Sequence, residues 1–505
     1  MGVIYAVVSR GTYQDDDLDH YYVALRAWQE PRLFIDAWAM PLLTLLLAVP
    51  AKLGGFLAVE ILSAVFSATA ALALGLTARR LGIRFTWAAS LLFLAQPLAL
   101  DLSYTVLAEP LAACLVSGVL WFWYDGRKDR ALALAGLLPL VRIESLFLLA
   151  LIGLAGWRDT TWRDRMIAAL PLAVWVMLST LVHHDPLYIL GGSYKPLNSL
   201  GVLHYARNLI VLAGPLVLFL YLWAWASARS RIRAAGDVGE SGSEPEPRFP
   251  LFAAVMVPYH LALLTLFAWD AMPVGRSVGF LRHTMVVLPA LALTASYGLA
   301  DWSRPAGRPL IRWILLLTAP VITAFFFSHT LVGSSYIGEG RFEARWILMT
   351  VTAVAGAAFL LRRFGDGIRL AAVGGAILLS LGFAGWTTRP HPLNVEQQCV
   401  LRAVDYLREY DLDRSVVYTG HPWFFFLADR DRYDRVHTPP LRLETLDQVP
   451  RGGVLLWENH YGDRPGGNVL WGNVPLETLV GDERFRMLFR AEASYFKLVL
   501  FQRKW

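Results

Sequence analysis

The sequence predicts a mainly helical fold, a polytopic transmembrane bundle of about 11–13 passes followed by a small α/β domain. Three observations lead to this prediction. Of the 505 residues, 56% are hydrophobic and only 17% are charged, and the mean hydropathy is +0.45. Apolar runs of about 20 residues, long enough to cross a hydrocarbon core, recur through the first three quarters of the chain. From residue 388 the composition turns hydrophilic.

Short basic loops separate the apolar runs. Arg79-Arg80 is the first of several basic clusters that recur at every second loop, which assigns those loops to the cytoplasm. Residues 1–9 are expected to end a first helix that starts upstream, which places the tail outside. The runs lie at 54–78, 85–100, 105–124, 131–156, 166–183, 208–227, 250–269, 283–300, 311–331, 345–361 and 369–387.

The run 131–156 has basic loops on both sides, so it is expected to enter and leave the membrane on the same face. Pro139 and the polar residues Arg142 and Glu144 interrupt it near the middle. Polar backbone at membrane depth is tolerated where it lines a cavity within the protein. The run is therefore predicted to be a short helical hairpin, and the alternative is one long tilted helix with a buried Arg–Glu pair.

Two domains are expected. Residues 1–387 form the membrane domain, in which the Ser-, Gly-, Glu- and Pro-rich segment 230–248 is a cytoplasmic linker. Residues 388–505 form an α/β domain outside the membrane, with a helix over 395–410 and strands near 416–418, 454–457 and 495–502. This domain has no glycine-rich phosphate loop and no metal-ligand spacing, so the sequence predicts no nucleotide site and no metal there.

Composition also limits the partners. The net charge is +6 and the isoelectric point is near 9.3, but the basic residues lie in topology-setting loops rather than on a soluble face. Nucleic acid is therefore excluded as a partner. The two cysteines, Cys114 and Cys399, predict neither a disulfide framework nor a thiolate metal site.

The acidic run Asp15-Asp16-Asp17-Leu18-Asp19, followed by His20-Tyr21-Tyr22, is the most informative feature of the chain. Carboxylates next to a bilayer are costly, and polar clusters at such boundaries are functional hypotheses by default. One or two of these acids would serve as charges at the start of a helix, but four exceed that need.

The predicted topology brings further polar side chains to the same outer face. Each has a structural alternative: a helix N-terminal charge for Glu109, an internal ion pair for Arg142 with Glu144, and a snorkelling anchor for Arg282. Their convergence with the acidic run predicts one site, to which Glu109, Arg142, Glu144, Arg282 and His283 contribute.

Such a site suits sugar transfer from a polyprenyl-phosphate carrier, because a donor that arrives through the lipid needs no nucleotide. A carboxylate can take the proton of an acceptor hydroxyl. Arginine can hold the lipid phosphate and offset the charge on the leaving group.

The chain resembles the GT-C superfamily of integral-membrane glycosyltransferases, which includes protein O-mannosyltransferases and lipid A aminoarabinose transferases. Ile143 stands where the family's hairpin tip has proline, and His283 where it has an aromatic residue. The resembling motifs are Asp16-Asp17 with Tyr21 and Tyr22, Met40-Pro41-Leu42-Leu43, Glu109-Pro110-Leu111, Leu140-Val141-Arg142-Ile143-Glu144, and Phe280-Leu281-Arg282-His283 leading to Leu288-Pro289.

The resemblance implies a GT-C type fold and assigns roles to these residues. Asp16 or Asp17 would be the catalytic base. The substrate-binding residues would be Asp15, Asp19, Tyr21, Glu109, Arg142, Glu144, Arg282 and His283. No cofactor is predicted, although a divalent cation on the first-loop aspartates is an alternative, because oligosaccharyltransferase relatives use one.

The expected function is therefore a hexosyl- or pentosyltransferase of the inner membrane. Its partners would be a polyprenyl-phosphate sugar, a glycan, lipid or protein acceptor, and membrane lipid. The alternative is a lipid or sugar transporter or flippase. Transporters usually carry their polar residues at mid-membrane in repeated halves, which this sequence does not show.

Overall fold

The computed structural model describes residues 1–190, 204–235, 248–268, 280–302, 390–462 and 472–505, with scattered residues between 371 and 388. These residues divide into two compact units. Unit 1 comprises Met1–Val7 and Val23–Arg389, and unit 2 comprises Val8–Tyr22 and Pro390–Trp505. The acidic run, expected in the membrane domain, thus groups with the C-terminal residues. The predicted runs 311–331 and 345–361 lie outside the described residues.

Unit 1 is a helical bundle of a multi-pass membrane protein. Among the described residues, three helices are long and apolar enough to cross a membrane: Pro41–Arg80, Trp162–His183 and Leu281–Asp301. The principal helices of this unit are α1 (Gly2–Val8), α3 (Pro41–Arg80), α4 (Thr86–Leu94), α5 (Pro97–Leu102), α6 (Ala108–Tyr124), α7 (Lys128–Ala135), α8 (Leu146–Ala155), α9 (Trp162–His183), α10 (His204–Ala213), α11 (Pro215–Ala235), α12 (Leu251–Ala268) and α13 (Leu288–Trp302).

Several predicted runs are divided or extended for identifiable reasons. Pro97 separates α4 from α5, and Gly214 with Pro215 separates α10 from α11, because proline disfavours helical geometry in the residue before it. The run expected to begin at 54 instead begins at Pro41, and Gly55 (φ 65°, ψ −157°) kinks the helix. Helix α11 continues to Ala235, so the first residues of the predicted linker 230–248 are helical.

The predicted hairpin over 131–156 is confirmed. Helices α7 and α8 contact each other, and two 3-10 turns, η2 (Leu138–Leu140) and η3 (Ile143–Ser145), join them. Pro139 lies within the first turn, where a continuous α-helix would lose a hydrogen bond. The alternative of one long tilted helix is therefore wrong.

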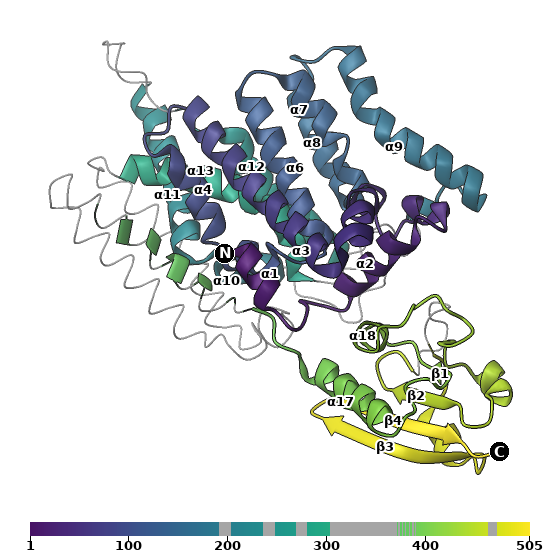
Figure 1. The fold of residues 1–505 in the computed structure, drawn as a ribbon. Coiled ribbons are helices and arrows are strands. Elements are labelled where there is room, and N and C mark those ends of the chain that lie inside the picture. Colours follow the sequence, from purple (N-terminus) through teal and green to yellow (C-terminus); the bar gives the residue numbers. More distant parts are fainter. Residues whose placement is uncertain are drawn as a thin grey trace. The chain divides into compact units, whose positions relative to one another are not determined.

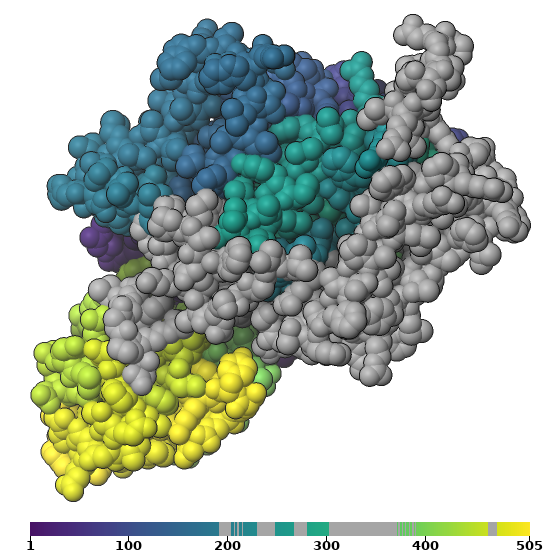
Figure 2. All heavy atoms as spheres, turned by 180° about the vertical axis from the view of Figure 1, so that it is seen from behind, coloured from purple at the N-terminus to yellow at the C-terminus, as the bar shows by residue number. Residues whose placement is uncertain are grey.

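Helix α13 belongs to the most buried of the three described membrane spans. Its apolar span is buried along its whole length, and it contacts α3, α4, α6, α11 and α12 (Figure 1). Helix α9 is the opposite case. Most of its apolar side chains are exposed, and they form part of the surface in Figure 2 (blue), as expected for a lipid-facing helix.

Unit 2 brings residues 8–22 together with the C-terminal residues 390–505. The N–H groups of Arg10 and Gly11 donate to the carbonyl of His391 at 3.0 and 2.9 Å. The Ser9 hydroxyl accepts the His391 N–H in return. A side chain at Gly11 would meet the Pro392 carbonyl at 2.4 Å, so only glycine permits this close approach.

The rest of unit 2 is an α/β fold around a four-stranded sheet of order β1-β2-β4-β3. Strands β1 and β2 are parallel and the other pairs are antiparallel. Leu455, Trp457, Val499 and Phe501 form much of its core. The strands are β1 (Val417–Tyr418), β2 (Val454–Glu458), β3 (Phe485–Ala493) and β4 (Phe496–Arg503), and the helices are α17 (Val395–Glu409), α18 (Pro422–Leu427) and α19 (Leu476–Val480).

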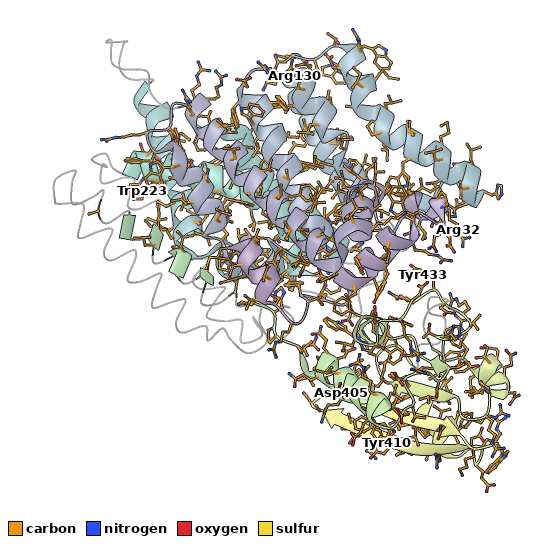
Figure 3. All side chains as sticks on the ribbon, in the orientation of Figure 1. Arg32, Arg130, Trp223, Asp405, Tyr410 and Tyr433 are labelled. Carbon is orange, nitrogen blue, oxygen red and sulfur yellow. The ribbon has the colours of Figure 1, made fainter. Side chains whose placement is uncertain are left out.

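Helix α17 covers part of this sheet, contacting β3 and β4 (Figure 1). An Asn394–Gln397 capping box starts it. Asp405 on α17 and Tyr410, directly after its end, are exposed (Figure 3). The predicted helix over 395–410 is confirmed as α17, and the three predicted strands are confirmed as β1, β2 and β4. Strand β3 and helices α18 and α19 were not predicted.

The packing of α13 against α11 gives a first prediction. A Cβ at Gly298 would lie 2.1 Å from the Leu220 carbonyl oxygen, so Gly298→Ala forces the two helices apart. We expect a loss of roughly 1–3 kcal/mol in the free energy of unfolding. Gly153→Ala on α8 is the control, because its Cβ would have 4.0 Å of clearance from its nearest neighbour. Thermal unfolding in detergent measures both, and equal stability of the two variants would contradict the packing.

Candidate functional site

The predicted site residues fall into two groups, one in each unit. Each group is brought together by segments far apart in the sequence. The group in unit 1, here called the arginine–glutamate cluster, comprises Glu109, Arg142, Glu144, Arg282 and His283. The group in unit 2 comprises Asp15, Asp16, Asp17, Asp19 and Tyr21.

Arg142 is the centre of the arginine–glutamate cluster. It donates to Glu109 through Nη1 and to Glu144 through Nε, at 2.7 Å, and Nη2. The Nε of Arg282 lies 3.5 Å from the same Glu109 oxygen, and His283 Nδ1 lies 4.0 Å from Glu144. All five residues are buried. The structure thus brings these five predicted residues together.

Local structure explains how each residue reaches the cluster. Glu109 lies in the first turn of α6, where a carboxylate is favoured by the helix dipole. Arg142 is extended (φ −151°, ψ 114°) between η2 and η3, and its side chain reaches Glu109 and Glu144. Arg282 and His283 lie on the 3-10 helix η5 (Leu281–Val287), which contacts α6. His260 on α12, which sequence reasoning missed, also interacts with Glu144 and His283.

In unit 2 the acidic run begins helix α2 (Asp16–Arg26). The Asp15 carbonyl accepts the N–H groups of Leu18 and Asp19, and the Asp17 carboxylate accepts the Gln14 N–H at 3.0 Å. Asp17 is buried and Asp16 is partly exposed. The acidic run therefore begins a helix, as expected if some of its aspartates serve as charges at a helix start. This role involves only some of the four aspartates.

Asp19 forms an ion pair within unit 2. It is bonded to Arg432, whose guanidinium also lies 5.9 Å from the ring centroid of Tyr22. Burial raises the pKa of Asp19 despite Arg432. Tyr21 packs against Tyr22 with ring centroids 5.4 Å apart, and burial raises the pKa of its hydroxyl.

Asp15 belongs to a third set of contacts in unit 2, here called the histidine–carboxylate cluster (Asp15, Glu396, His421, Glu458 and His460). Glu396 Oε1 lies 2.8 Å from His421 Nε2 and 2.7 Å from His460 Nδ1. Asp15 Oδ2 accepts the Tyr461 hydroxyl at 2.9 Å and lies 3.8 Å from His460 Nδ1. Glu458 accepts the backbone N–H groups of His460 and Tyr461.

The pKa values of the carboxylates in the histidine–carboxylate cluster are shifted in opposite directions. Burial and the charge of Glu396 raise the pKa of Asp15 to about 6. Burial would also raise the pKa of Glu396, but the hydrogen bonds from His421 and His460 lower it to about 2. Burial lowers the pKa of His460, but the hydrogen bond to Glu396 and the charges of Glu396, Asp15 and Glu458 together raise it above its ordinary value. The cluster thus holds three carboxylates, one more than its two histidines can neutralise.

Sequence reasoning missed Glu396, His421, Glu458 and His460, and assigned no metal-ligand spacing to this region. The signal was present at the strand ends. His421 follows β1 and His460 follows β2, and carboxyl ends of adjacent parallel strands meet at one edge of a sheet. The two strands were predicted, but their parallel pairing was not. The residues of the aromatic segment after His421, Trp423 to Phe425, are buried.

Comparison with known proteins supports the predicted fold. No protein-family model and no curated protein matches the chain. The apo structure of ArnT from Cupriavidus metallidurans is similar over 96% of this chain and 92% of that one, at 13% identity and a TM-score of 0.55. The same enzyme bound to undecaprenyl phosphate is similar over 99% and 96%, at 13% identity and a TM-score of 0.58. The chain therefore has the fold of ArnT.

The arginine–glutamate cluster gives a second prediction. Arg142→Leu leaves two buried carboxylates without their main partner, so we expect a loss of about 3–5 kcal/mol in the free energy of unfolding. The matched control is Arg80→Leu, whose side chain is 59% exposed and whose partner Asp125 keeps Arg127. The control should lose less than about 1 kcal/mol. Denaturant titration in detergent compares them, and a mild effect of Arg142→Leu would show that the cluster is not ionised.

Proposed function

We propose that this protein is a membrane glycosyltransferase that moves a sugar from a polyprenyl-phosphate carrier to an acceptor hydroxyl on the outer face of the inner membrane. The observation that carries the proposal is the structural likeness to ArnT over almost the whole chain, including ArnT bound to undecaprenyl phosphate. A hexose or a pentose fits this chemistry equally well. A glycan, a lipid or a protein can supply the acceptor hydroxyl.

The acidic run would supply the base. In a single displacement, the acceptor oxygen attacks the anomeric carbon as its proton passes to a carboxylate, and the bond from that carbon to the phosphate oxygen breaks. The carrier leaves as polyprenyl phosphate, and the anomeric configuration inverts. We assign the base to Asp16 or Asp17. Asp15 and Asp19 are bonded to Tyr461 and Arg432, which suits supporting roles.

The arginine–glutamate cluster would serve the donor. Arg282 is buried on η5 and is proposed to offset the charge that develops on the leaving phosphate. Arg142 directs its donors to Glu109 and Glu144, so we assign it to positioning these carboxylates. Glu109, Glu144 and His283 are proposed to bind the substrate from unit 1. Tyr21 of unit 2 is likewise proposed as a substrate-binding residue. Unit 2 is proposed to lie outside the cytoplasm, as basic-loop topology requires.

Aspartate-to-asparagine variants test the base. Asp16→Asn and Asp17→Asn keep side-chain size and the ability to accept a hydrogen bond, but they remove the basic oxygen. We expect the base variant to lose roughly 10²–10⁴-fold in transfer rate, with donor binding retained. The measurement is transfer from a radiolabelled polyprenyl-phosphate sugar in proteoliposomes, together with the anomeric configuration of the product.

Asp405→Asn is the control for this experiment, because Asp405 is an exposed carboxylate on α17 of the same unit. It should transfer sugar at the wild-type rate. If both first-loop variants keep wild-type transfer, the assignment of the base is wrong. If the wild-type protein moves the lipid-linked sugar across the bilayer without transferring it, the protein is a flippase instead.

A further inference from the structure

The histidine–carboxylate cluster contains donor atoms in the arrangement of a metal site. One oxygen each from Asp15 and Glu396 and Nδ1 of His460 lie within 4.8 Å of one another. The contacts of His460 Nδ1 with these oxygens measure 2.7 and 3.8 Å. Ligand atoms about 2.0–2.2 Å from a tetrahedral Zn²⁺ ion would lie within this range of one another. Small side-chain movements would therefore bring all three atoms to one ion.

A second possible set, Glu396 with His421 and Glu458, is less suited to an ion. His421 Nδ1 accepts the Trp423 N–H at 3.2 Å, and this bond requires an unprotonated nitrogen. The hydrogen-bond network therefore assigns the His421 proton to Nε2, which faces Glu396 and cannot bind a cation at the same time. Glu458 is occupied by the two backbone N–H groups that follow β2.

These same contacts orient the first set. His421 donates to the Glu396 carboxylate, and the Tyr461 hydroxyl donates to Asp15. The His460 ring stacks on Tyr461, with centroids 4.0 Å apart. Metal ligands are commonly held by hydrogen bonds of this kind from surrounding residues. The His460 side chain is 35% exposed, which leaves the site open to an ion from solvent.

We infer that Asp15, Glu396 and His460 bind a divalent transition-metal ion of the Zn²⁺ class, through two carboxylate oxygens and His460 Nδ1. The mixed oxygen and imidazole donors favour such an ion over Mg²⁺ or Ca²⁺, which prefer oxygen ligands alone. The ion would replace the proton shared by His460 and Glu396 and offset the repulsion between the carboxylates. It would also link the N-terminal acidic run to the C-terminal residues of unit 2. This inference does not rest on the proposed sugar transfer.

Zinc binding to the full-length protein tests the inference. The protein is purified in detergent without a polyhistidine tag, treated with EDTA, and titrated with Zn²⁺ by calorimetry. We expect one ion per chain in the wild type. Glu396→Gln and His460→Ala should each weaken binding by roughly tenfold or more, and Tyr461→Phe, which loses only a supporting hydrogen bond, by about tenfold.

His437→Ala is the matched control, because His437 also contacts a carboxylate, Asp434, but lies exposed and away from the cluster. It should bind Zn²⁺ as tightly as the wild type. If the wild type binds no stoichiometric ion, the inference is wrong. It is also wrong if His460→Ala and His437→Ala bind Zn²⁺ equally, because groups outside the cluster then bind the metal.

A second measurement needs only the wild-type chain, so it remains decisive if a variant does not fold. Diethyl pyrocarbonate modifies accessible histidines, and mass spectrometry locates the product. Saturating Zn²⁺ should protect His460 at least tenfold and leave the exposed His437 unprotected. Equal modification of His460 with and without Zn²⁺ would overturn the assignment.

Discussion

The arrangement of polar residues within unit 1 depends on the pairing of Arg142 with Glu109 and Glu144. Three buried charges cost several kcal/mol each unless they come together. Glu109 begins α6 and Arg142 lies at the hairpin tip, so their ion pair holds the tip against α6. Arg142 lies between the two 3-10 segments of the tip in an extended conformation, which a continuous helix would not allow. The hairpin brings Arg142 to Glu109, and the ion pair in turn stabilises the hairpin tip.

Unit 2 depends on a different constraint, the joining of residues 8–22 to the tail. Backbone hydrogen bonds between Arg10, Gly11 and His391 hold the segment before the acidic run, and Arg432 holds Asp19 within the run. The start of α2 is therefore fixed by contacts to residues 382 to 413 positions later in the chain. The first-loop acids are part of a folded α/β unit, which gives their carboxylates defined partners.

Local signals in the sequence were sufficient for much of the fold. The length of the apolar runs indicated the membrane helices, and Pro139 with Arg142 indicated the hairpin. The arginine–glutamate cluster followed from topology, because alternating loops place its members on one face. Other features depend on non-local pairing. The strand β3 has an exposed and partly polar pattern, and Glu396, His421 and His460 come together only when β1 and β2 pair in parallel.

The two buried polar clusters solve the same physical problem in different ways. The arginine–glutamate cluster balances two glutamates with two arginines, so its charges are compensated by the protein alone. The histidine–carboxylate cluster sets three carboxylates against two histidines, so even two charged histidines leave one carboxylate uncompensated. Protons can offset this excess, but they leave Asp15 and Glu396 in competition for charge. A divalent cation satisfies both carboxylates at once, and this difference in charge balance is why the inferred metal site lies in unit 2.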